Sequence, residues 1–391
     1  MSVKETHLKG TPESVIKYVS EQKEAQTVHF SEDETSNYYA ENGNVQGVWM
    51  GNGAAIQDLS GYVINSDLEK LLHGVTMDGQ DISKRGNHQS NRRMGSDWTF
   101  SAPKAASILA IEDARIKKWM LESVQQAIEN FYAKEMSYAR RGKGGVIIEF
   151  SEHIAAAGFL HETARAVDGI IDPQLHVHVV IPNIIQRADG QWAGLRSDYG
   201  KNSGKIYALG DTQAAFFMKK LQELGGYELV MRLECDKKGI EHLSFGVQGI
   251  SREAEDTFSG RKKQIQSYLL KSGIDPKKAT RKQKDFAVLN TRVSKDRNVD
   301  KKYLKDALRQ RARDAGIDID SILVAAAKRA VVIQQPKKQQ TCLLENAIMV
   351  TVQQLSGFGE NGAIINERQS AVEPNLDTLL GSKEKMEIQN Q

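Results

Sequence analysis

Residues 172–186 read DPQLHVHVVIPNIIQ, a mostly apolar sequence with histidines at two alternate positions. From Leu175 to Gln186 the short apolar and alternating pattern predicts a β-strand. Successive side chains of a strand point to opposite faces, so His176 and His178 share one face. The preceding strand-like run carries His161, and an antiparallel return places it beside that pair. Three imidazoles from two neighbouring strands form a candidate divalent-metal site with coordination positions left for substrate.

A histidine pair of this kind also arises by chance on half-exposed strands, and for an isolated pair that interpretation is the stronger one. The third histidine shifts the balance toward a site, and so do the neighbouring charged residues Glu162, Arg165 and Asp172. The remaining histidines have no such neighbours in the sequence, so we expect them on the surface or satisfied in the core.

The elements around this strand predict an α+β fold. Two further strand-like runs, Val146–Phe150 and Ile154–Thr163, come before it, and turn residues separate all three. From about Ala102 to Arg141 apolar residues recur at helical spacing, with a break expected near Glu112. A long helix followed by several neighbouring strands is typical of an antiparallel sheet covered by helices.

Shorter sequence patterns predict the helices and strands on either side of this central region. Thr11 followed by Pro12 is a helix start, and this helix carries Val15 to Val19, with Tyr18 near its end. Residues 97–101 (DWTFS) predict a short strand, and residues 211–224 predict a helix that ends at two glycines. Near Ser244 the pattern changes to basic and helical.

The net charge of +3 averages over two very different parts of the chain. Between residues 261 and 314 there are 18 Lys and Arg against 6 Asp and Glu, a net charge of +12, so the rest of the chain is net −9. A charge run is often only a solvated helix face. This excess is large enough to favour a nucleic-acid surface, with Tyr268, Phe286 and Tyr303 interleaved.

Length and composition exclude several classes of protein. The 391 residues suggest two or three domains, and the composition is that of a folded globular protein. We find no apolar stretch long enough to span a membrane and no N-terminal signal core. Two cysteines that lie far apart, Cys235 and Cys342, indicate a reducing compartment. No GxxxxGK[ST] string occurs, so the 391 residues encode no nucleotide-driven motor of the P-loop type.

Tyrosine is the second chemical signal. Tyr18 ends the first helix, and Tyr38 and Tyr39 follow a polar loop. A phenol is a weak nucleophile unless a base or a metal field assists it, and packed or surface aromatics are the simpler interpretation of each one. Asp97 begins the DWTFS strand, where a carboxylate can orient a histidine, accept a proton or merely cap the strand.

Several strings together resemble one known family, the MobF-class conjugative relaxases of the TrwC/TraI type. Residues 97–107 (DWTFSAPKAAS), 161–165 (HETAR) and 172–178 (DPQLHVH) are similar to its motif blocks. Residues 49–55 (WMGNGAA), 189–195 (DGQWAGL) and 258–274 support the likeness, which runs in the family's order to about residue 320. The resemblance implies an HUH endonuclease: an antiparallel-sheet palm with a helical fingers region that clamps DNA.

The activity that the resemblance implies is nicking of one strand at a plasmid transfer origin. A tyrosine attacks the scissile phosphate, leaving a 5′-phosphotyrosine link and a free 3′-hydroxyl, and the reverse reaction rejoins the strand. Matched residue by residue, His161, His176 and His178 are the metal ligands, and Asp97 supports them. The implied cofactor is a divalent ion, Mg²⁺ or Mn²⁺, with Zn²⁺ as the alternative.

Two departures from the family pattern concern the nucleophile and the third ligand. A family member often carries two tyrosine pairs, whereas here the first is reduced to Tyr18-Val19 and the second is Tyr38-Tyr39. We expect Tyr18 to be the nucleophile, with Tyr38 or Tyr39 as the fallback. His161 lies a few residues farther from the other two histidines than in the family pattern, which lengthens the turn through Val167–Ile171.

The expected organisation is a catalytic palm over residues 1–245, basic fingers over 246–330, and a linker or partly ordered segment over 331–391. DNA contacts are expected from two motif residues and from the basic segment: Lys104, Arg165, Arg261, Lys262, Lys263, Lys277, Lys278, Arg281 and Lys282.

The expected partners are single-stranded and hairpin transfer-origin DNA, accessory relaxosome proteins, a coupling protein, and a helicase in the same longer chain or in trans, in the cytoplasm. The alternatives are a rolling-circle replication initiator and a non-catalytic DNA-binding protein. A metal-dependent enzyme acting on small molecules leaves the basic segment unexplained.

Overall fold

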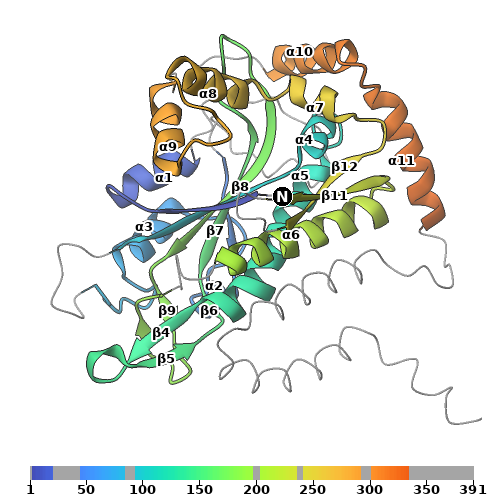
Figure 1. The fold of residues 1–391 in the computed structure, drawn as a ribbon. Helices are drawn as coiled ribbons and strands as arrows, with labels where there is room; N and C mark the ends of the chain where they lie inside the picture. The colour runs from blue at the N-terminus through green and yellow to red at the C-terminus, as the bar shows by residue number, and fades with distance from the viewer. Residues whose placement is uncertain are drawn as a thin grey trace, which may run out of the picture.

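The computed structural model describes residues 2–20, 45–83, 93–196, 203–235, 241–291 and 301–333. At its centre lies an antiparallel five-stranded sheet (Figure 1). In spatial order its strands are β1 (Ser2–His7), β3 (Gly95–Ser101), β8 (Pro173–Pro182), β7 (Ala156–Thr163) and β2 (Val48–Met50). The strand predicted from residues 172–186 is therefore the middle strand of the sheet.

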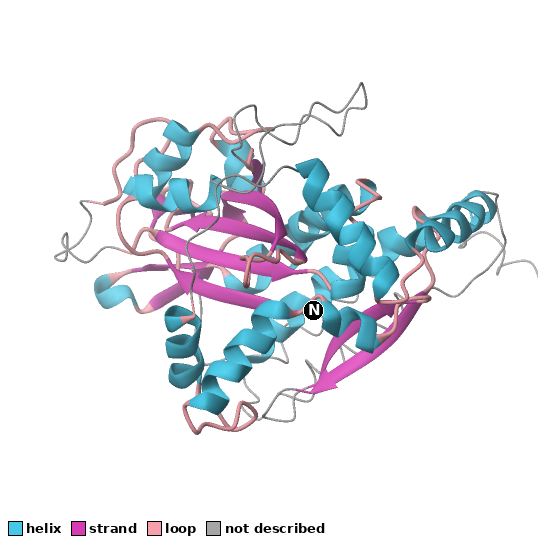
Figure 2. Cartoon of the chain, turned by 90° about the horizontal axis from the view of Figure 1, so that it is seen from above, coloured by secondary structure: helices cyan, strands magenta, loops and turns pink. Residues whose placement is uncertain are grey.

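One face of the sheet is covered by the helices that follow β3, as the view from above also shows (Figure 2). They are α4 (Lys104–Leu109), α5 (Arg115–Ala127), the π-helical η3 (Ile128–Met136) and α6 (Ser203–Glu223). Val177 and Val179 on β8 point into this core, together with Trp98 on β3. The expected break near Glu112 is confirmed, since α4 and α5 are separate helices.

The opposite face carries a second core beneath two N-terminal helices, α1 (Pro12–Ser20) and α3 (Asn65–His73). Phe159 of β7 and Val180 of β8 contribute to it from the sheet. Helix α1 begins as expected, because Thr11 accepts from the Ser14 backbone N–H while the Ser14 hydroxyl donates to the Thr11 carbonyl. The short α2 (Asn52–Ile56) follows Gly51, whose φ of +85° favours glycine.

Two predicted elements end earlier than the sequence indicates. The helix predicted to Arg141 stops at Met136, and β4 (Tyr138–Arg141) pairs with β5 (Ile147–Phe150) as a two-stranded ribbon. The run predicted to Gln186 breaks after Pro182, where the Ile184 N–H donates to the Pro182 carbonyl in a tight turn. Beyond this turn, β9 (Ile185–Gln186) belongs to a separate small sheet with β6 (His153–Ile154) and β10 (Trp192–Ala193).

The C-terminal part of the described chain is helical after one hairpin, which the sequence pattern did not predict. The hairpin joins β11 (Leu229–Cys235) to β12 (Glu241–Val247) and packs on α6. The helices that follow are α7 (Arg252–Thr257), α8 (Gly260–Lys271), α9 (Arg281–Asn290), α10 (Lys301–Asp314) and α11 (Ile319–Ile333). Helices α10 and α11 bury Leu308, Ala312 and Ala326 in the core beneath the sheet.

Helices α8 and α9 instead share a small apolar cluster of their own, built on Leu269, Ala279 and Ala287. They lie on the side of the molecule that carries α1, and only the start of α8 comes near α10 (Figure 1). In the described part of the chain, none of the helices combines the length and the apolar character that crossing a membrane requires.

Candidate active site

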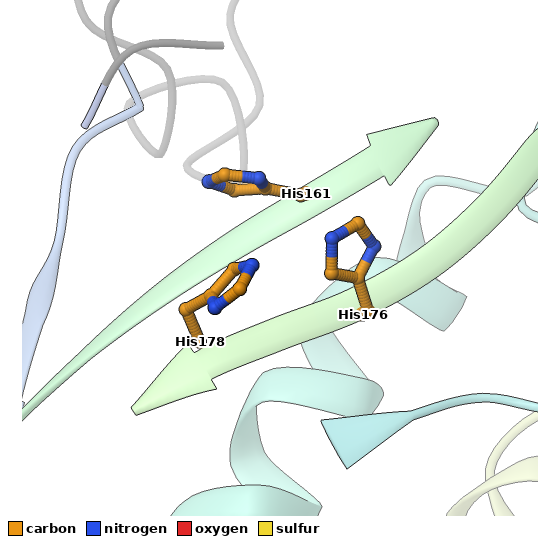
Figure 3. Close-up of side chains that lie close together, drawn as sticks. All are labelled: His161, His176 and His178. Atoms are coloured by element: carbon orange, nitrogen blue, oxygen red, sulfur yellow. The ribbon is translucent and has the colours of Figure 1, made fainter. Parts of the chain in front are cut away.

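Strands β7 and β8 bring the three predicted histidines together. His161 pairs directly with His176, and Phe159 pairs with His178, so all three imidazoles leave the same face of the sheet. Their ring centroids lie 5.0–5.2 Å apart in edge-on pairs. One nitrogen from each ring lies within 4.8 Å of the others (Figure 3). This convergence is the feature that an antiparallel return predicted.

Each imidazole is also held by an acceptor on its other side. His178 Nδ1 lies 2.8 Å and 3.0 Å from the two carboxylate oxygens of Asp97, and both side chains are less than a tenth exposed. His176 Nδ1 donates to the Gln174 carbonyl at 2.8 Å. His161 Nε2 donates to the Val19 carbonyl, also at 2.8 Å. These acceptors determine which ring nitrogen carries the proton and which keeps a lone pair.

The donor set fits a divalent metal ion. The unprotonated nitrogens are Nε2 of His176 and His178 and Nδ1 of His161, three neutral donors of the type that binds transition metals. Three protein ligands would leave coordination positions of such an ion open for substrate and water. Another group of potential ligands, Glu13, Glu69 and His73, lies at the surface of α1 and α3, where acidic groups commonly gather without an ion.

Helix α1 presents Tyr18 to this cluster. The Tyr18 ring meets the His178 ring edge-on, with centroids 5.5 Å apart, and 46% of the residue stays exposed. The next carbonyl along the helix, that of Val19, accepts the proton of His161, so α1 is tied to the histidine strands beside the phenol. Tyr38 and Tyr39 lie outside the described residues.

The predicted DNA-contacting residues of the basic segment fall into two groups. Most are exposed cations on or between α8 and α9: Lys262, Lys263, Lys277, Lys278, Arg281 and Lys282. Arg261 differs, because its guanidinium donates to the Thr291 carbonyl at 2.6 Å and the Val288 carbonyl at 2.8 Å. Arg261 thus fastens the start of α8 to the end of α9.

Lys104 and Arg165, the two predicted DNA-contacting residues outside the basic segment, are both half-buried. Arg165 lies just beyond β7. Lys104 donates from Nζ to the Pro173 carbonyl at 2.8 Å, beneath the start of β8. The pKa of Lys104 is lowered to about 8, mainly by burial and in smaller part by the nearby Arg311, while Asp172 and Glu255 oppose this shift.

Three contacts at the site were not predicted from the sequence. The Thr99 hydroxyl lies 3.3 Å from His178 Nδ1, and the carbonyls of Val19 and Gln174 hold the other two rings. Strand alternation was the available signal for Thr99, since it stands two residues from Asp97 on the same strand and face. Backbone carbonyls carry no residue-type signal at all.

Comparisons with known proteins agree on one family. A family model described as TrwC relaxase matches residues 13–315. Multifunctional conjugation protein TraI of Escherichia coli K12 is 31% identical over 297 residues, which is 75% of this chain and 16% of TraI. A second E. coli protein of the same name is 30% identical over 326 residues, 82% of this chain and 18% of its own length. The chain therefore spans a small part of these relatives.

Solved structures extend the likeness to three dimensions. A conjugative relaxase TrwC in complex with oriT DNA superposes with a TM-score of 0.64 at 30% identity, covering 81% of this chain and 99% of that chain. A metal-bound TrwC–oriT complex gives 0.63 at 29% identity with the same coverage. The expected α+β fold, an antiparallel sheet covered by helices, is confirmed.

Proposed function

The chain belongs to the TrwC relaxase family, and we propose that it is a metal-dependent conjugative DNA relaxase that nicks and rejoins one strand at a plasmid transfer origin. The observation that carries the proposal is the position of Tyr18 against His178, with the adjacent Val19 carbonyl on His161. A nucleophile and a three-histidine cluster share one small surface. The relatives named for conjugation and solved with oriT DNA support the same activity.

In the proposed reaction the Tyr18 oxygen attacks the scissile phosphorus in line with the leaving 3′-oxygen. A P–O bond to tyrosine forms as the bond to the 3′-oxygen breaks, the phenol proton passes to solvent, and the 3′-oxygen takes up a proton. The product is a 5′-phosphotyrosine and a 3′-hydroxyl. Because the new bond is again a phosphodiester, attack by a 3′-hydroxyl reverses the step without ATP.

The chain's own groups prepare this reaction. His161, His176 and His178 would hold the divalent ion, which supplies charge stabilisation on the phosphate oxygens when bound. Asp97 accepts the Nδ1 proton of His178, which orients the ring and makes it a stronger donor to a metal ion. An all-imidazole donor set suits Zn²⁺ better than Mg²⁺, which prefers oxygen ligands.

The DNA surface is proposed to combine the exposed cations of α8 and α9 with the rim of the histidine site. Those helices belong to the region of residues 246–330 that we propose as the basic fingers, with residues 1–245 as the proposed palm. Exposed lysines and arginines bind the phosphate backbone without reading its sequence. Tyr38 or Tyr39 is the proposed source of a second transfer.

Unwinding is assigned to a helicase, in the same longer chain or in trans, and accessory relaxosome proteins and a coupling protein are proposed as further partners in the cytoplasm. These assignments rest on the relatives' conjugation name alone.

An adduct assay tests the proposal directly. Labelled single-stranded oligonucleotides from the plasmid's transfer origin and from its replication origin are incubated with the protein and Mn²⁺, then resolved in SDS. We expect an SDS-resistant adduct with transfer-origin DNA, lost in Tyr18→Phe and retained in the control Tyr62→Phe. An adduct with replication-origin DNA alone indicates an initiator, and no adduct with either DNA indicates a binding protein.

The companion variants Tyr38→Phe and Tyr39→Phe complete the set. If one of them abolishes the adduct while Tyr18→Phe retains it, the assignment of the nucleophile is wrong. Removing divalent ions with EDTA should abolish adduct formation, and Mn²⁺ should restore it.

A further inference from the structure

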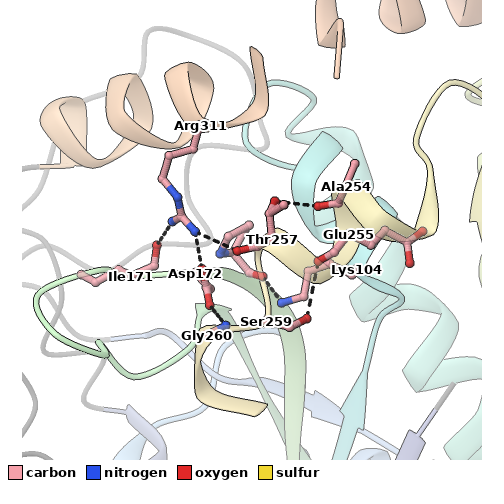
Figure 4. Close-up of polar contacts among 10 residues, drawn as sticks. Lys104, Ile171, Asp172, Ala254, Glu255, Thr257, Ser259, Gly260 and Arg311 are labelled. Atoms are coloured by element: carbon pink, nitrogen blue, oxygen red, sulfur yellow. Dashed lines mark hydrogen bonds and ion pairs between the residues drawn. The ribbon is translucent and has the colours of Figure 1, made fainter. Parts of the chain in front are cut away.

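A buried carboxylate at the start of β8 joins parts of the chain that are far apart in sequence. The Asp172 side chain is only 6% exposed. One of its oxygens accepts from the Gly260 backbone N–H at 2.7 Å, where α8 begins. The other accepts from the Arg311 guanidinium of α10 at 2.8 Å (Figure 4). We call Asp172 with Arg311 and Gly260 the carboxylate junction.

Arg311 is held at this junction by more than one bond. Its guanidinium also donates to the Ile171 carbonyl at 3.1 Å and to the Thr257 carbonyl at 3.4 Å. The same group lies over the Phe258 ring, 4.7 Å from its centroid. A planar guanidinium can serve several acceptors and stack at once, which a lysine ammonium cannot do.

Gly260 has a steric reason for its identity. A Cβ at this position would lie 3.1 Å from the Asp172 carboxylate oxygen, closer than an ordinary contact. The absence of a side chain therefore lets the first N–H of α8 reach the carboxylate. Backbone N–H groups at a helix start are well suited to bind an anion.

The junction also lies next to the histidine site along the chain. Asp172 precedes β8, the strand that carries His176 and His178. The first residue of that strand, Pro173, is held from below by Lys104 of α4. On its other side, the junction fixes the start of α8, whose exposed face carries Lys262 and Lys263. Asp172 therefore holds the start of α8, which carries part of the basic surface, next to the start of β8, which carries two of the histidines.

We propose that Asp172 and Arg311 form a positioning pair that holds the basic helices α8 and α9 in register with the histidine cluster. The inference rests on the proposed function, because it concerns how DNA on those helices reaches the histidines. Neither residue touches the reacting phosphate in this assignment. The pair instead makes DNA binding and metal binding mutually dependent, so that each ligand strengthens the other.

The test measures that dependence without any cleavage. The Mn²⁺ affinity of the full chain is determined by calorimetry with and without an oligothymidylate, and the oligothymidylate affinity with and without Mn²⁺. We expect the oligothymidylate to tighten Mn²⁺ binding by about tenfold, or about 1.4 kcal/mol, in the wild-type protein. The reciprocal experiment must give the same factor.

Substitution of Arg311 should remove this factor. In Arg311→Met we expect each ligand to bind separately, with the coupling factor reduced to near unity. Arg311→Lys keeps the positive charge, and with it the ion pair to Asp172, but loses the several guanidinium hydrogen bonds and the stacking on Phe258. We expect the same loss of coupling in this variant. The matched control is Arg309→Met, which removes an arginine of the same helix that pairs with Asp320 and Glu112 instead.

The possible outcomes distinguish a failure of the positioning role from a failure of the proposed function. If the wild-type protein binds both ligands without coupling, or if both Arg311 variants fold and keep the wild-type factor, the positioning role is refuted. If the wild-type protein binds neither Mn²⁺ nor the oligothymidylate, the proposed function itself fails. A lower melting temperature with unchanged coupling would identify the pair as purely structural and overturn the inference.

Discussion

Asp97→Asn is the substitution that tests the chemistry of the histidine site most directly. With its amide oxygen turned toward Nδ1, the asparagine still accepts the His178 proton, so the substitution removes the negative charge while an acceptor stays in place. Both partners are less than a tenth exposed and share two contacts of 2.8 Å and 3.0 Å, so solvent does not weaken the pair. The change therefore isolates the electrostatic part of the interaction.

The expected magnitude follows from how such carboxylates act on metal-binding histidines. Removing one typically lowers metal affinity about 10- to 100-fold, which is about 1.4 to 2.8 kcal/mol. The loss of metal affinity in Asp97→Asn should lie near the lower bound of this range. Asp97→Ala should lie near the upper bound, because it leaves Nδ1 with the Thr99 hydroxyl at 3.3 Å and no longer selects the tautomer.

Competition of each variant against a chelating dye for Mn²⁺ measures the effect. Asp189→Asn, at an exposed carboxylate, serves as the control and should bind like the wild-type protein. If Asp97→Asn and Asp97→Ala both bind Mn²⁺ as tightly as the wild-type protein, Asp97 does not support the ligand and the reasoning is refuted.

Two further predictions concern stability. The pKa of Lys104 falls from 10.5 to about 8 on folding, so the unfolded chain binds more protons between these pH values. Relative to Lys104→Met, the free energy of unfolding of the wild-type protein should rise by up to about 3 kcal/mol across this window in denaturant titrations. Gly226→Ala should cost about 3 kcal/mol or more, because φ is +70° and the new Cβ would lie 2.1 Å from the Ala326 carbonyl oxygen of α11. Its matched control Gly273→Ala, with φ of +71° in open space, should cost about 1 kcal/mol, and equal shifts in the urea midpoint would contradict this.

Patterns within a single element were sufficient for much of the fold and for the histidine cluster. Alternation predicted β8 and the shared face of His176 and His178, and helical spacing predicted the α4–α5 region with its break. The failures occurred where tertiary pairing overrides local preference. Residues 138–141 (YARR) continue a helical pattern, yet they form β4 because β5 offers a partner.

Contacts between distant parts of the chain had no sequence signal. Asp172 and Arg311 are 139 positions apart, and nothing in either neighbourhood indicates that they pair. Gly260 was visible only as part of a string similar to the relaxase family. Its steric reason appears once the carboxylate oxygen lies 3.1 Å from the position of a Cβ.

The connection between His161 and His176 shows that the histidine cluster depends on strand register. Beyond the paired residues of β7 and β8 the chain forms a loop, in which Val167 and Ile170 exchange backbone hydrogen bonds of 2.9 Å. A register shift between His161 and Thr163 also lies outside the pairing of His161 with His176. A slip of one residue would turn His161 to the opposite face, and a slip of two would move it about 7 Å along the strand. The cluster therefore depends on strand register and not on the number of residues in the loop, so loop insertions are compatible with it wherever the pairing of these two histidines is kept.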